Sequence, residues 1–328
     1  MQTTSQHPFD RLTPSFIMDA IETQGFYCDC RILALNSYEN RVYQVGIEDG
    51  EPLIAKFYRP DRWSDQQIIE EHQFTQELAK HELPVVAPLS NDASESLFDY
   101  QDFRFALYPR KGGHAPELDN LEHLKVLGRL LGRIHLIGAQ APFRHRPKLD
   151  SQTFGHQNVK LIAEKFIPAD YRESYQSLTR DLLQIIDERL ALYSDIRNIR
   201  THGDCHSGNM LWRDDAPNFV DFDDARMAPA IQDLWMLLSG EEAQQKRQLE
   251  KILEGYHEFN DFDFRELQLI ESLRTLRIMN YSAWLATRWD DPAFPRTFPW
   301  FHTLQYWGEH ILELREQLSA LLEPALSL

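Results

Sequence analysis

The residues with the clearest chemical potential lie in one short part of the sequence. His202-Gly203-Asp204-Cys205-His206-Ser207-Gly208-Asn209 is followed by Phe219-Val220-Asp221-Phe222-Asp223-Asp224. A carboxylate stands five residues before an amide, and another carboxylate follows the amide twelve residues later. This order matches a phosphoryl-transfer layout, in which one Asp orients and deprotonates the attacking hydroxyl. The Asn and the second Asp supply hard oxygen ligands to a Mg²⁺ ion that bridges nucleotide phosphates.

The elements that must position these residues follow from the sequence pattern. Residues 1–108 predict a small β-rich lobe with one internal helix, and 109–113, Pro-Arg-Lys-Gly-Gly, predict a hinge. Residues 114–328 predict a larger and mainly helical lobe, interrupted over 200–229 by strand-like pieces that carry most of the chemistry. The expected fold class is therefore α+β with two lobes. The strands of the small lobe are expected over 31–35, 41–47, 53–58, 83–89, 97–100 and 103–108, with helices over 13–25 and 64–81.

The catalytic segment resembles the aminoglycoside-phosphotransferase-like branch of the protein-kinase fold, whose loop reads His-Gly-Asp-x-His-x-x-Asn. Within that branch the chain is most similar to the bacterial stress response kinase A family, which acts on Ser/Thr side chains of proteins. Four segments spread over nearly the whole chain carry this closer resemblance: residues 35–44 (Leu-Asn-Ser-Tyr-Glu-Asn-Arg-Val-Tyr-Gln), 56–60 (Lys-Phe-Tyr-Arg-Pro), 70–74 (Glu-Glu-His-Gln-Phe) and 291–295 (Asp-Pro-Ala-Phe-Pro).

The resemblance implies a role for each residue of the catalytic block. Asp204 would be the catalytic base, and Asn209 and Asp221 would hold Mg²⁺. The alternative is that Asp204 only caps a turn and Asp221 only ends a strand, but spacing and order are both intact. Asp223 either assists a second metal or is solvated, and Asp224 is expected to be a surface or structural residue.

The same resemblance implies a nucleotide site in the small lobe, with ATP as phosphoryl donor. Lys56 would contact the α- and β-phosphates and be held by a helix glutamate. Glu71 is favoured over Glu70 because Glu71 shares a helix face with Phe74 and Leu78. No Gly-x-Gly-x-x-Gly loop occurs, so the polar turn over 36–40 is expected to bind phosphate, with Ser37 as candidate contact; an ordinary polar hairpin is the alternative. Adenine is expected at hinge backbone around Leu107–Arg110.

Two departures from eukaryotic-type kinases concern regulation. The His-Arg-Asp of those enzymes is His202-Gly203-Asp204 here, without the arginine that reads a phosphorylated loop, and the segment 221–229 is very short. We therefore expect no activation by phosphorylation of that loop. His202 and His206 also allow a zinc interpretation, but they lie in a loop without a second ligand pair, so His206 is expected to hold the loop by hydrogen bonds.

Composition excludes several classes of function. The chain has 328 residues, with 34 Lys and Arg against 51 Asp and Glu, which gives a formal charge of −17. This charge argues against nucleic acid as a partner, since phosphate binding needs a basic face. We expect no membrane span and no export signal, because apolar runs are short and residues 1–11 lack a basic start and an apolar core. Three cysteines without a C-x-x-C pair suit the cytoplasm, and a monomer is expected.

Three other functions remain open from the residues alone. The first keeps the fold and phosphorylates a small hydroxyl compound, such as an aminoglycoside, choline or homoserine, because the catalytic block does not distinguish acceptors. Its acceptor cleft would lie in the helical lobe, where aromatic surface is supplied by Trp235, Trp284, Trp289 and Trp300. The second is a metal-dependent phosphohydrolase, but Met210 stands where a further His is needed. The third is a nucleotide-binding module without catalysis, but the presence of Asp204, Asn209, Asp221 and Lys56 argues against it.

Overall fold

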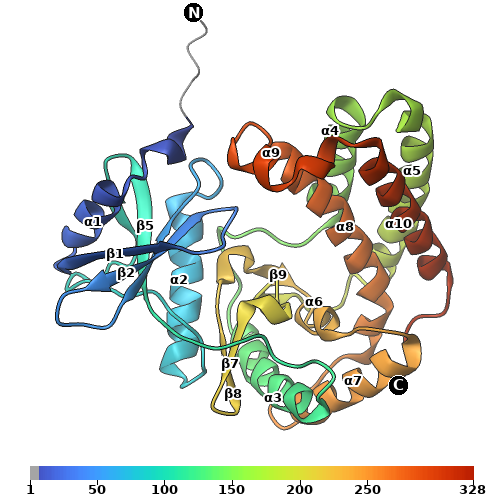
Figure 1. Ribbon diagram of the computed structural model, residues 1–328. Coiled ribbons are helices and arrows are strands. Elements are labelled where there is room, and N and C mark those ends of the chain that lie inside the picture. The colour runs from blue at the N-terminus through green and yellow to red at the C-terminus, as the bar shows by residue number, and fades with distance from the viewer. Residues whose placement is uncertain (1–6) are drawn as a thin grey trace, which may run out of the picture. The chain divides into compact units, whose positions relative to one another are not determined.

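The computed structural model describes residues 7–328, which divide into two compact units (Figure 1). The first six residues, which entered the argument against an export signal, lie outside this range. The N-terminal unit consists of the chain up to Glu117, Phe143–Arg146 and His206–Ala225. The C-terminal unit consists of Leu118–Pro142, Pro147–Cys205 and Arg226–Leu328. The sequence predicted a single boundary at a hinge over 109–113. The structure differs from this because residues 206–225 belong to the N-terminal unit.

An antiparallel sheet with strand order β1-β2-β3-β5-β4 forms the centre of the N-terminal unit (Figure 1). Its strands are β1 (Cys28–Ala34), β2 (Arg41–Ile47), β3 (Leu53–Phe57), β4 (Phe98–Tyr100) and β5 (Phe103–Pro109). These confirm the expected strands to within a few residues, because short aliphatic and aromatic runs between turns suit a pleated sheet. The register sets Lys56 opposite Val42 on one side and Ala106 on the other.

The strand expected over 83–89 is wrong. Val85 makes only an isolated parallel bridge to Phe219, and the Val86 N–H donates to the Phe219 carbonyl at 2.9 Å. Pro84 and Pro88 bracket the segment, and proline has no N–H to give to a ladder. The segment therefore runs beside the chain at Phe219 without joining the five-stranded sheet.

Side-chain alternation along β3 separates two packed faces of this sheet. Ala55 and Phe57 belong to one apolar cluster together with Ile17 and Ile21 of helix α1 (Pro14–Glu22). Tyr58 belongs to a second cluster with Ile68 of helix α2 (Asp65–Lys80). Successive strand residues point to opposite faces, which places Lys56 on the α2 side. Both helices begin at the expected caps: the Thr13 hydroxyl accepts from Phe16 N–H, and Ser64 forms a reciprocal capping box with Gln67.

A small hairpin carries the second half of the acidic block into the N-terminal unit. It consists of β7 (Met210–Arg213) and β8 (Ala216–Phe219). Asp214 and Asp215 form its two-residue turn with φ of +52° and +60°, which is the left-handed geometry that tight hairpins need. Trp212 of β7 bridges to His114, and the two backbones exchange hydrogen bonds of 3.1 and 2.6 Å.

The C-terminal unit is mainly helical, with one short antiparallel pair, β6 (Ile199–Thr201) and β9 (Arg226–Ala228). A π-helical turn, Gln152–His156, leads into α4 and was not expected from the sequence. Within residues 7–328 no helix combines the length and apolarity needed to cross a bilayer. The helices are α3 (Leu121–Gly138), α4 (Gln157–Lys165), α5 (Ala169–Leu192), α6 (Ile231–Leu234), α7 (Glu242–Tyr256), α8 (Ile270–Thr287), α9 (Ala293–Thr297) and α10 (Leu304–Leu322).

Helices α3 and α7 lie backbone to backbone because glycines line their contact. A Cβ atom at Gly128 would fall on the Ile252 carbonyl, and one at Gly132 would stand 2.6 Å from the Tyr256 carbonyl oxygen. From the other helix, a Cβ at Gly255 would fall on the Lys125 carbonyl. Backbone atoms cannot move aside as flexible side chains can, so this close approach requires glycine.

We expect Gly128→Ala to lower the free energy of unfolding by about 1–3 kcal/mol, because the added methyl forces α3 and α7 apart. Gly308→Ala is the matched control: it also lies within a helix, but its Cβ would meet only the Tyr171 hydroxyl at an ordinary 3.4 Å. There alanine should be neutral or stabilise by up to about 1 kcal/mol. Thermal and urea unfolding of both variants measure this, and equal effects would show that the glycine contact is unimportant.

Candidate active site

The backbone of His202 and Gly203 is fixed by one buried carboxylate. Asp233 of α6 accepts from the His202 N–H at 2.8 Å and from the Gly203 N–H at 2.9 Å. The neighbouring Gln232 amide donates to the Gly203 carbonyl at 3.0 Å. Gly203 has φ of +83°, which glycine adopts without strain. The start of the catalytic segment is therefore held in one conformation immediately before Asp204.

A buried chain of hydrogen-bonded polar groups extends from the Asp233 carboxylate. Nε2 of His135, on α3, lies 3.1 Å from Oδ2 of Asp233, the oxygen that also accepts from the His202 N–H, and Nδ1 of His135 lies 3.0 Å from the Tyr256 hydroxyl. The carboxylate is an acceptor only, so Nε2 carries the proton and Nδ1 accepts from Tyr256. The Asn260 amide then donates to the Tyr256 oxygen at 3.1 Å. Sequence reasoning missed this chain, because its members lie on α3, on α6 and at or just after the end of α7, far apart in the sequence.

Asp204 forms an ion pair that sequence reasoning also missed. Arg277 of α8 donates to its carboxylate, and both residues belong to the C-terminal unit. The Asp204 side chain is 23% exposed, so the carboxylate remains accessible to a small group. The 73 positions between the two residues leave no local signal of the pair.

The two histidines of the segment both act as hydrogen-bond acceptors toward backbone. The Asp204 N–H donates to Nδ1 of the buried His202 at 3.4 Å, and the Gly208 N–H donates to Nδ1 of His206 at 3.0 Å. The second bond is of the kind expected for His206. Among residues 7–328 there is no group of three or more His, Cys, Asp and Glu side chains arranged to hold a metal.

Asn209 and Asp221 stand at the two ends of hairpin β7–β8, in the N-terminal unit. The Val220 N–H donates to the Asn209 carbonyl at 3.0 Å, next to the Met210–Phe219 pair that closes the ladder. Asp221 then has φ of +60°, a left-handed conformation that is costly for a residue other than glycine. Because the two strands are antiparallel, the residues that precede and follow the hairpin, Asn209 and Asp221, lie at the same end of it, and these are the two expected metal ligands.

Lys56 is buried beside this end of the hairpin. Its Nζ lies 2.8 Å from Oδ1 of Asp221 and 3.2 Å from Oδ1 of Asp223. Burial by itself would lower the pKa of Lys56, but the two carboxylates outweigh it and hold the pKa well above its usual value. Lys56 is therefore a permanent cation whose partners are the two acids.

Asp223 is buried, so the interpretation of it as a solvated residue is wrong. Arg62 donates to its carboxylate at 2.6 Å, Lys56 lies on its other oxygen, and Arg146 donates to its carbonyl. Burial would raise the pKa of Asp223, but Lys56 and Arg62 hold it below the usual range. Asp224 is paired with the second nitrogen of Arg62 at 3.0 Å. Neither arginine was identified from the sequence, because each is isolated from the acidic block along the chain.

The two glutamates of α2 have different environments. Glu70 accepts from the backbone N–H groups of His145 and Arg146, each at 2.8 Å, and so ties the segment 143–146 to α2. Glu71 is buried, and its Oε2 accepts no hydrogen bond from any residue in 7–328, while Nε2 of His72 lies 3.7 Å away. Its pairing with Lys56 stays a prediction, since Lys56 forms its ion pairs with Asp221 and Asp223.

The other two expected nucleotide contacts, Ser37 and Leu107, lie outside the cluster formed by Lys56, Asp221 and Asp223. Ser37 lies in the turn between β1 and β2, and its hydroxyl donates to the Asn40 carbonyl at 3.1 Å. Leu107 is fully buried in the apolar cluster on the α1 side of the sheet, opposite to Lys56, and its carbonyl accepts from the Leu89 N–H at 2.8 Å. Both contacts with nucleotide stay predictions.

The tryptophans expected to supply aromatic surface for an acceptor cleft are buried or only partly exposed. Trp235 is buried under the guanidinium of Arg274, whose Cζ lies 5.4 Å from the ring. Trp284 stacks against Tyr281 at 5.9 Å, and Trp300 is 38% exposed. Most of this aromatic surface therefore serves packing.

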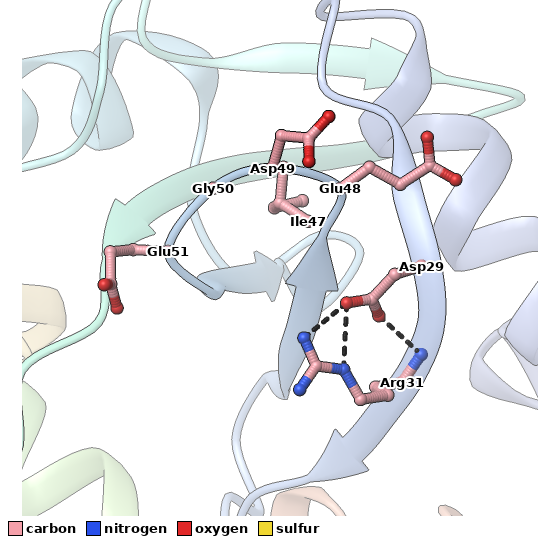
Figure 2. Close-up of a pocket in the computed structure, with 7 residues that line it drawn as sticks. All are labelled: Asp29, Arg31, Ile47, Glu48, Asp49, Gly50 and Glu51. Atoms are coloured by element: carbon pink, nitrogen blue, oxygen red, sulfur yellow. Dashed lines mark hydrogen bonds and ion pairs between the residues drawn. The ribbon is translucent and has the colours of Figure 1, made fainter.

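A pocket at the far edge of the sheet is separate from these residues. It is lined by the β2–β3 turn and by Asp29 and Arg31 of β1, which are paired with each other (Figure 2). Its acidic side chains Glu48, Asp49 and Glu51 point in different directions (Figure 2). It contains none of the candidate residues.

The environment of Glu71 predicts a pH-dependent stability. Burial raises the pKa of Glu71 to about 7, against the opposing influence of Lys56 and Arg146. The folded protein thus binds an extra proton between pH 4.5 and 7, so its free energy of unfolding should fall as pH rises through this range, by at most about 3 kcal/mol. Glu71→Gln should lack this dependence in urea unfolding.

Comparing the wild type with Glu71→Gln separates the effect of Glu71 on stability from that of its neighbour His72. Burial lowers the pKa of His72 to about 3, which makes stability fall as pH drops below about 6.5, but this happens in both proteins. Parallel stability curves for wild type and Glu71→Gln would show that Glu71 ionises normally.

Comparison with known proteins identifies the class. The model of a phosphotransferase enzyme family, APH, matches residues 31–270, a range that contains the whole acidic block, Lys56 and Glu71. The protein is a phosphotransferase that acts as a kinase.

Full-length relatives identify the particular family. Stress response kinase A of Salmonella choleraesuis (strain SC-B67) is 45% identical over 321 residues, which cover 98% of this chain and 97% of the relative. Serine/threonine protein kinase RdoA of Salmonella typhimurium gives the same values, and stress response kinase A of Escherichia coli (strain K12) is 44% identical over 325 residues, 99% of this chain and 98% of the relative. The chain belongs to the stress response kinase A family.

Solved structures confirm the expected fold. An amicoumacin kinase in complex with AMP-PNP, Ca²⁺ and amicoumacin superimposes with a TM-score of 0.68 at 21% identity, covering 90% of this chain and 93% of that one. A spectinomycin phosphotransferase in complex with ADP and spectinomycin gives 0.64 at 14% identity, covering 92% and 97%. The α+β fold with a β-rich N-terminal part and a mainly helical remainder is therefore that of phosphotransferases of this kind.

Proposed function

We propose that the protein transfers the γ-phosphoryl group of Mg-ATP to a Ser or Thr hydroxyl of a protein, with Asp204 as base, Asn209 and Asp221 as metal ligands, and Lys56 as the phosphate contact. The observation that carries this proposal is the 2.8 Å ion pair between the buried Lys56 and the half-exposed Asp221, at the end of the hairpin that Asn209 and Asp221 flank. It joins a phosphate-binding cation and a metal-binding anion in one cluster. The names of the full-length relatives support the protein acceptor.

The donor atoms of this cluster fit Mg²⁺. An Asp carboxylate and an Asn amide oxygen are hard ligands, which Mg²⁺ prefers, and the ion usually keeps several waters besides one or two protein oxygens. When bound, it would neutralise charge on the nucleotide phosphates. The Asp221 side chain is 55% exposed, so solvent and ligands reach it. Glu71 supports the exchange this requires: its buried Oε2 lacks a donor among residues 7–328 and can accept Lys56 when Lys56 leaves Asp221.

In the reaction the chain's own residues position groups and move one proton. Asp204 accepts the proton of the acceptor hydroxyl as its oxygen attacks the γ-phosphorus. The bond between the γ-phosphorus and the bridging oxygen breaks, and ADP leaves with the electron pair. Asp233 fixes the backbone ahead of Asp204, and Arg277 fixes its carboxylate, so little reorganisation is needed during transfer.

A second acceptor class is favoured by the fold neighbours. The solved structures with similar folds are named for amicoumacin, aminopropanol and spectinomycin, which are small hydroxyl compounds. The family match does not support the phosphohydrolase considered from the sequence. We also propose a cytoplasmic location, for which the free thiols of Cys28, Cys30 and Cys205 are the supporting observation.

Transfer of labelled γ-phosphate from ATP with Mg²⁺ tests the proposal, with generic protein acceptors and small alcohols compared side by side. Asp204→Ala should reduce transfer by about 10²–10⁴-fold while ATP binding is largely kept. Asp221→Ala should weaken binding of the metal–nucleotide complex as well. Asp181→Ala, an exposed acid of α5, is the control and should behave as wild type. Wild-type transfer by Asp204→Ala would contradict the mechanism.

The Arg277–Asp204 pair predicts a separable effect on turnover. Arg277→Met should lower kcat by about 10–100-fold, because the carboxylate loses its fixed orientation, and leave the KM for ATP nearly unchanged. Arg277→Lys should recover part of kcat, since it keeps the charge but not the planar fork. Arg180→Met, an exposed arginine of α5, serves as control. A rise in the KM for ATP with constant kcat would show that Arg277 acts elsewhere.

A further inference from the structure

The expected phosphate-binding turn is held by two arginines instead of being built from glycines. Arg59, which follows β3, donates through Nε to the Glu39 carbonyl at 2.9 Å and through Nη2 to the Tyr38 carbonyl at 3.1 Å. Arg41, the first residue of β2, donates to the Tyr38 and Asn40 carbonyls at 3.1 and 3.3 Å. Three successive carbonyls of the turn are thus bound by guanidinium groups, which fixes the direction of its peptide planes.

Side chains connect the same turn to the acidic cluster. The Glu39 carboxylate pairs with Arg59 at 3.1 Å and with Arg62 at 3.2 Å. Arg62 in turn pairs with Asp223, whose other oxygen is bound by Lys56. A change in the position of Arg59 or Glu39 is therefore transmitted to the groups proposed to bind the metal and the phosphates.

The ring of Phe9 lies against both arginines. Its centroid is 4.2 Å from Cζ of Arg41 and 5.1 Å from Cζ of Arg59, and Phe9 is only 7% exposed. Two guanidinium groups beside one turn repel each other, and the negative face of an aromatic ring offsets this repulsion. Phe9 therefore stabilises the arrangement of cations that orients the turn.

Phe9 is itself held firmly in place. It lies in a short 3₁₀ helix, Pro8–Arg11, which is closed by a reciprocal capping box between His7 and Asp10. Its ring packs nearly parallel to that of Phe103 of β5, with centroids 6.1 Å apart. Arg11 donates to the Gln101 carbonyl at 3.1 Å, in the turn between β4 and β5.

We propose that the segment 7–11 is part of the nucleotide-binding machinery, with Phe9 as a positioning residue that orders the turn 36–40 through Arg41 and Arg59. The segment precedes the range 31–270 matched by the phosphotransferase model, so nothing in that match assigns it a role. This inference rests on the proposed function for its catalytic consequence. Its structural consequence, the order of the turn, is independent of catalysis.

The test compares Phe9→Leu with Phe9→Trp, because leucine keeps an apolar side chain but removes the ring, whereas tryptophan keeps the ring face. Losing two cation–π contacts of about 0.5–1 kcal/mol each corresponds to a rise in the KM for ATP of about 5–30-fold. The kcat at saturating ATP should change less than about two-fold, because Phe9 touches no reacting group. Phe9→Trp should restore most of the wild-type KM, since indole is the strongest of the aromatic cation binders.

Phe16→Leu is the matched control. Phe16 lies in α1, close to Phe9 in the sequence, and packs against Phe57, Tyr100 and Phe103. Within residues 7–328, however, no cation lies over its ring. It should lower thermal stability and leave the KM for ATP unchanged. If Phe16→Leu raised the KM as much as Phe9→Leu, general loss of packing would explain both and the proposal would be overturned.

Amide hydrogen exchange of the nucleotide-free protein separates the proposal from the proposed function. Phe9→Leu should speed exchange over residues 36–41, and Phe9→Trp should not. If the wild type neither binds ATP nor transfers phosphate, the proposed function fails, but the exchange comparison still decides whether Phe9 orders the turn. Unchanged exchange in Phe9→Leu, or an unchanged KM in an active enzyme, overturns the inference.

Discussion

The buried ammonium group of Lys56 is the constraint on which the N-terminal unit depends. A buried cation is tolerated only where anions neutralise it, and Asp221 and Asp223 do this at 2.8 and 3.2 Å. Asp221 comes 165 positions later in the chain, so the pair requires hairpin β7–β8 to be anchored to this unit. The surplus negative charge in turn requires Arg62 and Arg146, and the latter is brought in by a segment tied to α2 through Glu70. The discontinuous composition of the unit follows from this one pair.

The C-terminal unit contains the corresponding anchor for the catalytic segment. Asp233 is fully buried and accepts from two successive backbone N–H groups and from His135, so its charge is satisfied by three donors. Removing one donor would leave a buried charge less fully compensated, which costs more than the loss of an ordinary hydrogen bond. This makes the backbone before Asp204 rigid while the Asp204 side chain stays partly exposed. A fixed backbone with an accessible carboxylate suits the proposed role of Asp204 as proton acceptor.

Sequence reasoning identified the candidate catalytic and ligand-binding residues better than it identified the residues that hold them in place. Asp204, Asn209, Asp221 and Lys56 were recognisable because chemistry fixes their type and order along the chain. The strands and capped helices were predictable because alternation and caps are local signals. Arg62, Arg146, Asp233 and Arg277 were missed, since their contacts span 30 or more positions and leave no local pattern. The prediction of a strand over 83–89 was wrong because it gave the apolar residues of this segment more weight than its two prolines, Pro84 and Pro88.

The two acids that bind Lys56 differ in a way that suits a change of partners. Asp223 is 5% exposed and is also bound by Arg62, so releasing it would cost several kcal/mol. Asp221 is 55% exposed, so water or a metal ion can take the place of Lys56 there at much lower cost. In the proposed reaction Asp221 is thus the exchangeable partner and Asp223 the permanent one. Lys56 keeps one carboxylate throughout and turns its remaining donors toward phosphate and Glu71, so no step leaves a buried cation unpaired.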